Sequence, residues 1–106
     1  MITSTAETIH GKQIVKTIGL VRGNTIRARH VGRDIMAVLR TLVGGEITEY
    51  TKLLAEAREQ ALDRMEDEAK RLGANAVVGV RFSTSVVLGG AAELLAYGTG
   101  VVISDD

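Results

Sequence analysis

The sequence predicts a small α/β domain built in two layers (α+β), in which one long helix packs on a small sheet in the element order β-α-β-β. Residues 13–22 are rich in β-branched side chains, residues 47–72 repeat apolar side chains at helical spacing, and residues 75–88 and 92–103 are two apolar runs around a glycine pair. A right-handed crossover can join the first two strands, which leaves room for the third strand between them, antiparallel to both. With 106 residues, the chain is long enough for a single domain, residues 1–106.

The first predicted strand, QIVKTIGLVR, is bounded by Gly11 and by Gly23-Asn24, which are typical of turns. Residues 25–29 either extend this strand or form a second short one. Beyond them, the spacing of apolar residues predicts a short helix that ends at Gly44-Gly45. Its apolar positions are Val31, Ile35, Val38, Leu39 and Leu42.

The long helix, from about Ile47 to Leu72, has the clearest pattern in the chain. Acidic residues occupy its first turn and Lys70 and Arg71 its last turn, as the helix dipole favours. Gly73 follows in the position of a left-handed C-terminal cap. Steps of three and four form one apolar stripe, made of Ile47, Tyr50, Leu54, Ala57, Ala61, Met65, Ala69 and Leu72.

The last two strands form a predicted hairpin around Gly89-Gly90. A two-residue turn pairs Leu88 with Ala91 and Phe82 with Tyr97. The face expected to pack on the long helix then carries Val78, Val80, Phe82, Val86, Leu95, Tyr97, Val101 and Ile103. The other face is small and largely apolar, unlike the charged face of a solvated antiparallel sheet; it carries Val77, Gly79, Arg81, Ser83, Ser85, Val87, Leu94, Ala96, Gly98, Gly100 and Val102.

Two features of this prediction favour an oligomer. One helix covers only one side of the sheet, so the second apolar face needs another cover. A helix of about 25 residues is also about 38 Å long, whereas a compact domain of this size is about 33 Å across, so the helix is expected to overhang its domain. We therefore expect other copies of the chain to complete the core. In the alternative, the short helix covers the second face and the protein is monomeric.

Composition excludes several classes of partner and site. The 13 basic and 13 acidic side chains cancel, which argues against general electrostatic capture of nucleic acid or of an anionic membrane. The chain has no Cys, so it has no disulfide or soft thiolate metal site. The N-terminus lacks the pattern of a secretion signal and no apolar run is long enough to span a bilayer. We expect a cytoplasmic protein that binds neither nucleic acid nor membrane.

The candidate site residues are two histidines and a group of arginines. His10 and His30 are candidate metal ligands, although they are 20 residues apart and neither belongs to a recognised ligand pair. Residues 22–40 are basic, and Arg27, Arg29 and Arg33 are candidates for binding a phosphate or carboxylate, because arginine forks suit these groups. In the alternative reading, these arginines pair with carboxylates of a neighbouring subunit.

Several blocks of the chain are similar to one known family. ITSTAETIHG, IGLVRGNTIRARHVGRDI, LVGGEITEYTKLLAEAREQALDRM, ANAVVGVRF and LAYGTGVV together resemble the YbjQ-like family, from Ile2 to about Ile103. This is a bacterial and archaeal family without an assigned reaction that carries a heavy-metal-binding label. The resemblance implies a dodecin-like β-α-β-β subunit assembled into a homo-oligomeric ring, with a pentamer as the expected size. The lack of Cys argues against a soft heavy metal as the ligand.

Three functions are compatible with these observations. The first is a non-enzymatic oligomeric binding or scaffold protein, with a metal ion as one candidate ligand from the family label. The second is a binder of anionic metabolites or nucleotides through the arginines of residues 22–40. The third is an enzyme whose active site forms between subunits, with Glu49 as a candidate acid or base and Glu93 near the hairpin turn. No catalytic residue is predicted, because neither carboxylate has a visible catalytic partner.

Overall fold

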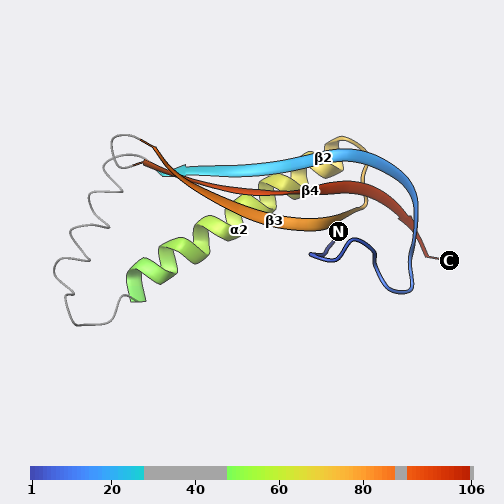
Figure 1. The fold of residues 1–106 in the computed structure, drawn as a ribbon, viewed down its shortest axis with the longest axis horizontal. Coiled ribbons are helices and arrows are strands. Elements are labelled where there is room, and N and C mark those ends of the chain that lie inside the picture. Colours follow the sequence, from blue (N-terminus) through green and yellow to red (C-terminus); the bar gives the residue numbers. More distant parts are fainter. Residues whose placement is uncertain (28–47, 88–90, 106) are drawn as a thin grey trace.

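The computed structural model describes residues 1–27, 48–87 and 91–105. In this part of the chain, the order of elements is β1 (Ile2–Thr3), β2 (Gln13–Arg27), α2 (Thr48–Arg71), β3 (Ala76–Val87) and β4 (Ala91–Ser104). Figure 1 shows two layers, with α2 running along one face of a long sheet. The predicted two-layer α+β architecture is therefore confirmed.

The sheet has the strand order β1-β3-β4-β2. β4 is antiparallel to both β2 and β3, and β1 is parallel to β3. The third strand of the predicted motif thus lies between the first and the second, in the position that the predicted crossover leaves open for it. β1 is an additional short strand that the sequence pattern did not reveal. β2 is one continuous strand, which settles the question of residues 25–29 in favour of an extension as far as Arg27.

The helix and its C-terminal cap match the prediction closely. The amide of Ala74 donates to the carbonyl of Ala69 at 2.9 Å and the amide of Gly73 donates to the carbonyl of Lys70 at 3.1 Å. This pair of bonds is a Schellman motif, and it requires the left-handed conformation that Gly73 adopts, with φ +96°. The carbonyls of Ala69 and Lys70 in the last turn are thereby satisfied, and the chain turns back into β3.

The main core lies between α2 and the strands β2, β3 and β4. Its buried members are small or aliphatic, namely Val21, Ala61, Met65, Ala69, Ala74, Val77, Val80 and Ala96. The helix approaches β2 so closely that a Cβ on Gly23 would lie 2.2 Å from the backbone nitrogen of Met65 and 2.4 Å from the carbonyl oxygen of Ala61. Only a glycine permits this approach, which explains how a core with few large side chains is packed.

The predicted assignment of the hairpin faces is wrong for most positions. Val87 pairs with Ala91 and Arg81 pairs with Tyr97, so the register differs by one residue from the predicted one and Phe82 faces Ala96. Because side chains alternate along a strand, a shift of one residue exchanges the two faces. The small residues Ala96 and Gly98 therefore face the helix. Val80 still reaches the core because a bulge between Val78 and Arg81 restores the phase.

The second face of the sheet, which we call the outer face, has a small core of its own. Ala76, Val78 and Val101 are buried there. Ile9, Ile14 and Ile103 pack against them, so the chain that follows β1 covers one end of this face. The sequence predicted an apolar second face that needed a cover from another chain. In the structure, some residues of that predicted face pack against the helix, and the N-terminal chain covers one end of the face opposite the helix. The predicted short helix over Val31–Leu42 and the turn Gly89-Gly90 lie outside the described residues.

The predicted overhang of the helix is also wrong. The 24 residues of α2 extend about 36 Å, but the 15 residues of β2 extend about 50 Å. The sheet is therefore at least as long as the helix, and the described residues measure 54 × 25 × 16 Å. The domain is long and thin instead of compact, so the comparison with a compact diameter did not apply.

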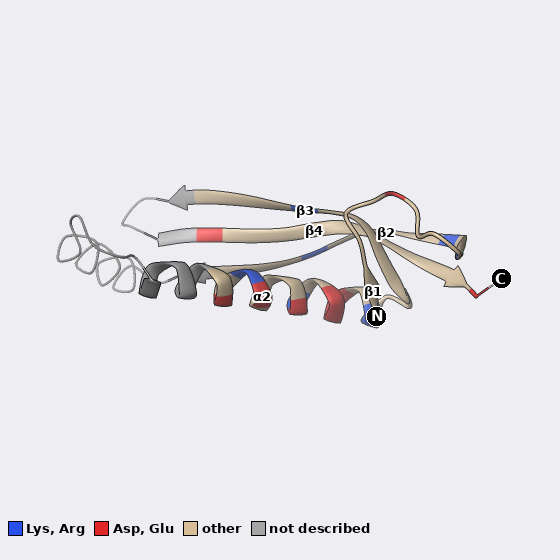
Figure 2. Cartoon of the chain, turned by 90° about the horizontal axis from the view of Figure 1, so that it is seen from below, with Lys and Arg blue, Asp and Glu red and all other residues tan. Residues whose placement is uncertain are grey.

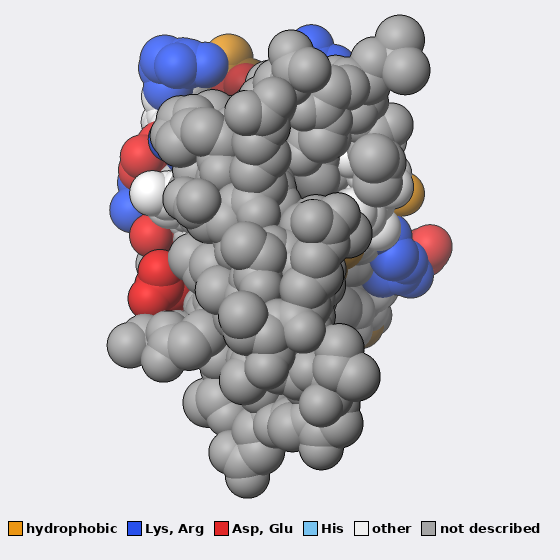
Figure 3. Space-filling view, turned by 90° about the vertical axis from the view of Figure 1, so that its left-hand side faces the viewer, with side chains coloured by type: hydrophobic (Ala, Val, Ile, Leu, Met, Phe, Trp, Pro, Cys, Tyr) orange, Lys and Arg blue, Asp and Glu red, His pale blue; other side chains and the backbone are white. Residues whose placement is uncertain are grey.

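Charged side chains lie mainly away from the sheet. Figure 2 shows acidic and basic residues following one another along the side of α2 that points away from the strands, while the strands carry few charges. In the end-on view of Figure 3, charged side chains lie along both flanks of the described part. In the described chain no helix is both long enough and apolar enough to cross a bilayer.

Candidate functional site

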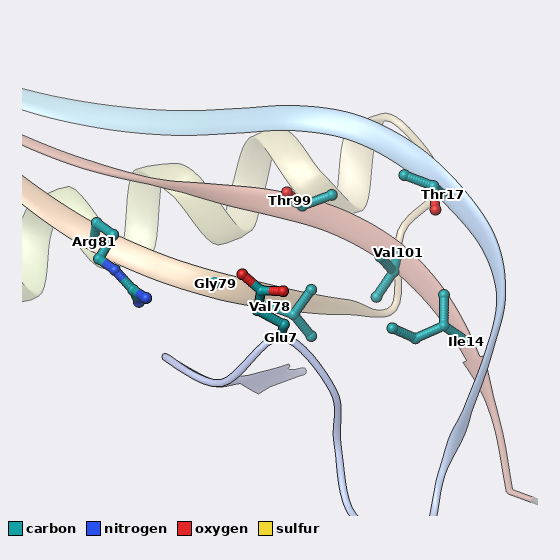
Figure 4. Close-up of a pocket in the computed structure, with 8 residues that line it drawn as sticks. All are labelled: Glu7, Ile14, Thr17, Val78, Gly79, Arg81, Thr99 and Val101. Carbon is teal, nitrogen blue, oxygen red and sulfur yellow. The ribbon is translucent and has the colours of Figure 1, made fainter.

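The candidate site is an open pocket on the outer face, with a volume of about 470 Å³. Figure 4 shows it between the sheet and the N-terminal segment, by which we mean residues 4–9. All three long strands contribute to it, and so does the N-terminal segment. Its lining residues are Glu7, Ile14, Thr17, Val78, Gly79, Arg81, Thr99 and Val101.

The pocket exists because the N-terminal segment follows β3 and then leaves it. The amide of Ser4 donates to the carbonyl of Val77 at 2.9 Å, which continues the pairing of β1 with β3. At the bulge, the amides of Gly79 and Val80 both point to this segment and donate to the carbonyls of Ala6 and Ser4 at 2.8 and 3.0 Å. Gly79 has φ +64°, which other residues rarely adopt. The bulge thus fixes the segment that carries Glu7.

Arg81 is held in one orientation by the same segment. Its Nη1 atom donates to the carbonyl of Thr5 at 2.8 Å and to the carbonyl of Val80 at 2.8 Å. These two bonds use both hydrogens of Nη1. The hydrogens on Nε and Nη2 have no partner among the described residues, and a guanidinium carries five such donors in a planar fork. The residue therefore presents the side of its fork that suits a bidentate carboxylate or phosphate.

The pocket combines opposite charges with an apolar floor. Glu7 lies on the N-terminal segment and Arg81 on β3, and in the described part of the chain they form no ion pair with each other. Thr17 and Thr99 add hydroxyl groups from β2 and β4, and Ile14, Val78 and Val101 provide apolar contact. Such an arrangement can bind a small polar molecule in a defined orientation. The usual volume of ligand pockets is about 300–1,000 Å³.

Of the residues predicted from the sequence as ligands, only His10 has a described side chain, and it does not line this pocket. His10 is exposed in the turn between Ile9 and Lys12. His30, Arg29 and Arg33 lie outside the described residues. Arg27 ends β2, and its side chain, like that of Glu49 in α2, is not among those described. The anion-binding interpretation of residues 22–40 therefore stays a prediction.

Glu93 has a structural partner within its own subunit. It lies opposite Ser85, and not opposite Val86 as the predicted register required. Its Oε2 atom accepts a hydrogen bond of 3.0 Å from Nδ2 of Asn24, which joins β4 to β2 across the sheet. This bond accounts for the carboxylate without a catalytic role.

The donors available in the described residues do not fit a heavy-metal site. The 106-residue sequence has no Cys, and among the described residues no group of three His, Asp or Glu side chains converges on one point. A soft metal prefers thiolate and a borderline metal needs several converging nitrogen or carboxylate ligands. We therefore derive no chemistry from a bound metal.

Sequence analysis missed the pocket because its parts are distant in the chain. Glu7, Thr17 and Thr99 belong to no motif, and only the pairing of β1 with β3 brings Glu7 beside the sheet. One signal for Arg81 was available, since it is the sole charged residue between Ala74 and Leu88. A charge in an otherwise uncharged strand indicates that the strand has a polar environment at that position.

The fold and the pocket define a small two-layer α+β domain with a site of a size suited to a small molecule. Comparison with known proteins then places it: the model of the family described as "Putative heavy-metal-binding" matches residues 1–104. The chain therefore belongs to this YbjQ-like family, and the predicted resemblance is confirmed.

Relatives in archaea and bacteria match this chain over nearly their whole length. A UPF0145 protein of Methanosarcina acetivorans is 60% identical over 103 residues, which cover 97% of both chains. One from Dehalococcoides mccartyi strain BAV1 is 58% identical and covers 97% of this chain and 99% of its own. A crystal structure of a protein of unknown function from Pediococcus pentosaceus superimposes with a TM-score of 0.60 at 18% identity, covering 98% of each chain. That likeness concerns the fold alone.

Proposed function

We propose that the protein is a non-enzymatic binding protein that works as a homo-oligomer, with its subunits joined through the free edge of β3. The observation that carries this proposal is the difference between the two edges of the sheet. From the family resemblance we further propose that the subunits form a ring. The expected size is a pentamer, and the expected arrangement of the subunit is dodecin-like. A cytoplasmic location is part of the proposal.

The β2 edge is covered by side chains of α2. The amide of Arg22 donates to Oε1 of Glu68 at 3.2 Å, and Nη1 of Arg64 donates to the carbonyl of Asn24 at 2.6 Å. Backbone groups that would otherwise be open to another strand are thus occupied within the subunit. Such protection is typical of edges that must not pair.

The β3 edge is open beyond its contact with the N-terminus. The amide of Val80 donates to the carbonyl of Ser4 and thus points away from β4. Because strand groups alternate in direction, the backbone of Phe82 and Thr84 points away from β4 as well. These groups have no hydrogen-bond partner within the described part of the chain. Phe82 is also 44% exposed, and the strand from Arg81 to Val87 has no Pro or Lys to discourage pairing. An edge with these properties suits a strand of a second copy.

Native mass spectrometry of the intact protein tests the proposal. We expect the mass of several chains, five in the expected ring. Phe82→Lys puts a charge on the free edge and should release single chains. Leu72→Lys is the matched control, because Leu72 is 49% exposed at the end of α2, and it should leave the assembly intact. A single-chain mass for the unaltered protein, or an unchanged assembly in Phe82→Lys, contradicts the proposal.

The same preparation separates a binding protein from an enzyme. A small molecule that is bound and released unchanged supports the binding function. Turnover of any substrate that is lost in Glu49→Gln with the assembly intact would instead support an active site between subunits.

A further inference from the structure

We propose that the outer-face pocket is a binding site for a zwitterionic α-amino acid with an aliphatic side chain. In this site Arg81 binds the carboxylate, Glu7 binds the ammonium group, and the apolar floor receives the side chain. The inference rests on the proposed binding function but not on the proposed assembly, because the pocket lies on the outer face of the sheet and not along the free edge of β3.

The first argument is the state of Arg81. Both hydrogens of Nη1 are donated to backbone carbonyls, of Thr5 and Val80, at 2.8 Å each. The remaining donors, on Nε and Nη2, form the side of the guanidinium that binds both oxygens of a carboxylate at once. Because the fork is already fixed, little side-chain entropy is lost when a ligand binds. Figure 4 shows the side chain extending from β3 toward the side of the sheet on which Glu7 lies.

The second argument is the charge of the whole pocket. Glu7 is in the lining, so an anion bound at Arg81 also meets the negative charge of Glu7, which weakens its binding. A simple cation meets the same problem with Arg81. A zwitterion satisfies both charges, and the absence of an ion pair between these two residues in the described structure leaves both available.

The third argument is the remainder of the lining. Ile14, Val78 and Val101 are aliphatic, and no aromatic side chain is among the lining residues. This floor favours an aliphatic group over a flat aromatic ring, which would lack a stacking partner. Thr17 and Thr99 provide hydroxyls, which can donate to a carboxylate or accept from an ammonium group.

The test uses L-leucine as the probe, with the intact protein and amide NMR spectra. We expect saturable shifts at Gly79, Thr99 and the Nε–H of Arg81. Two fragments of leucine distinguish the ligand class without any change in the protein. 4-Methylpentanoate lacks the ammonium group and isoamylamine lacks the carboxylate, and each should bind at least about tenfold more weakly, as expected for the loss of one charge-assisted contact.

Variants then assign the two charges. Glu7→Gln and Arg81→Gln should each weaken leucine binding about tenfold or more. Glu59→Gln and Arg58→Gln are matched controls, because both residues are exposed on α2, and they should bind leucine normally. Arg81→Gln also removes the bond to Thr5, so the fragment series serves as the measurement that is independent of folding.

Three results would overturn the inference: no saturable shift with millimolar leucine, equal binding of either fragment, or unchanged affinity in Glu7→Gln. Equal binding of 4-methylpentanoate would make the pocket a plain anion site. Native mass measured on the same sample separates this inference from the proposed function. If the assembly forms but does not bind leucine, only the proposed leucine site is wrong. If single chains bind leucine, only the proposed assembly is wrong.

Discussion

Replacement of Gly23 by alanine tests the central packing contact of the fold. The Cβ of an alanine at this position would lie 2.2, 2.4 and 2.7 Å from backbone atoms of Met65, Ala61 and Arg64. A carbon atom needs about 3.5 Å, so the helix must move by about 1 Å. Backbone of a helix cannot move at one point alone, and the whole buried stripe of α2 would have to leave its position on the sheet.

The expected cost is at the upper end of the range for overpacking, about 3 kcal/mol. For a domain of this size, that corresponds to a fall in melting temperature of about 12–24 °C, measured by calorimetry at one fixed protein concentration. Gly100→Ala is the matched control. Its Cβ would meet only side chains and one carbonyl, at 3.1 Å or more, so its cost should be below about 1 kcal/mol. Equal melting temperatures for the two variants would refute the close backbone contact between α2 and β2 at Gly23.

Two further predictions concern the core and the pairing of the chain ends. Met65 is fully buried, so Met65→Ala should cost about 2–5 kcal/mol, whereas Leu72→Ala, at an exposed position, should cost about 0.5 kcal/mol in urea unfolding. Lys12 donates a hydrogen bond to Asp105 and adds its positive charge, which together hold the pKa of that carboxyl below its ordinary value of 3.8. The contribution of this pair to stability is therefore present above pH 3.8 and is lost as the pH falls through the lowered folded-state value. Lys12→Met should return the pKa of Asp105 toward 3.8 in an NMR titration, and an unchanged pKa would contradict this assignment.

The predictions from sequence were most accurate where local chemistry decides the structure. The stripe that includes Ala57, Ala61, Met65 and Ala69 placed the helix within one residue at each end, and all four are buried. Gly73 predicted the cap, because few other residues adopt its conformation. The position of the last strand between the other two was expected as a possibility, because a right-handed crossover between the first two strands leaves room for it.

The predictions failed where the structure depends on one residue of register. The strands β3 and β4 pair one residue out of the expected register, so Arg81 pairs with Tyr97 and Ala96 faces the helix. The bulge at Gly79 then exchanges the two faces of β3 a second time. Alternation along a strand has a period of two, so each such step exchanges the faces. When a strand carries small apolar residues on both faces, its sequence does not indicate which face packs against the helix.

The family, the order of β2, α2, β3 and β4, the long helix with its cap, and the lack of thiolates could all be inferred from the sequence. These properties depend on composition or on residues within a few positions of one another. Three properties depend instead on the folded chain: which face of the sheet meets the helix, which edge of the sheet stays open, and that Glu7 and Arg81 line one pocket. The physical reason is that Glu7 and Arg81, 74 positions apart in the chain, come together only through the pairing of β1 with β3 and the bulge that follows it.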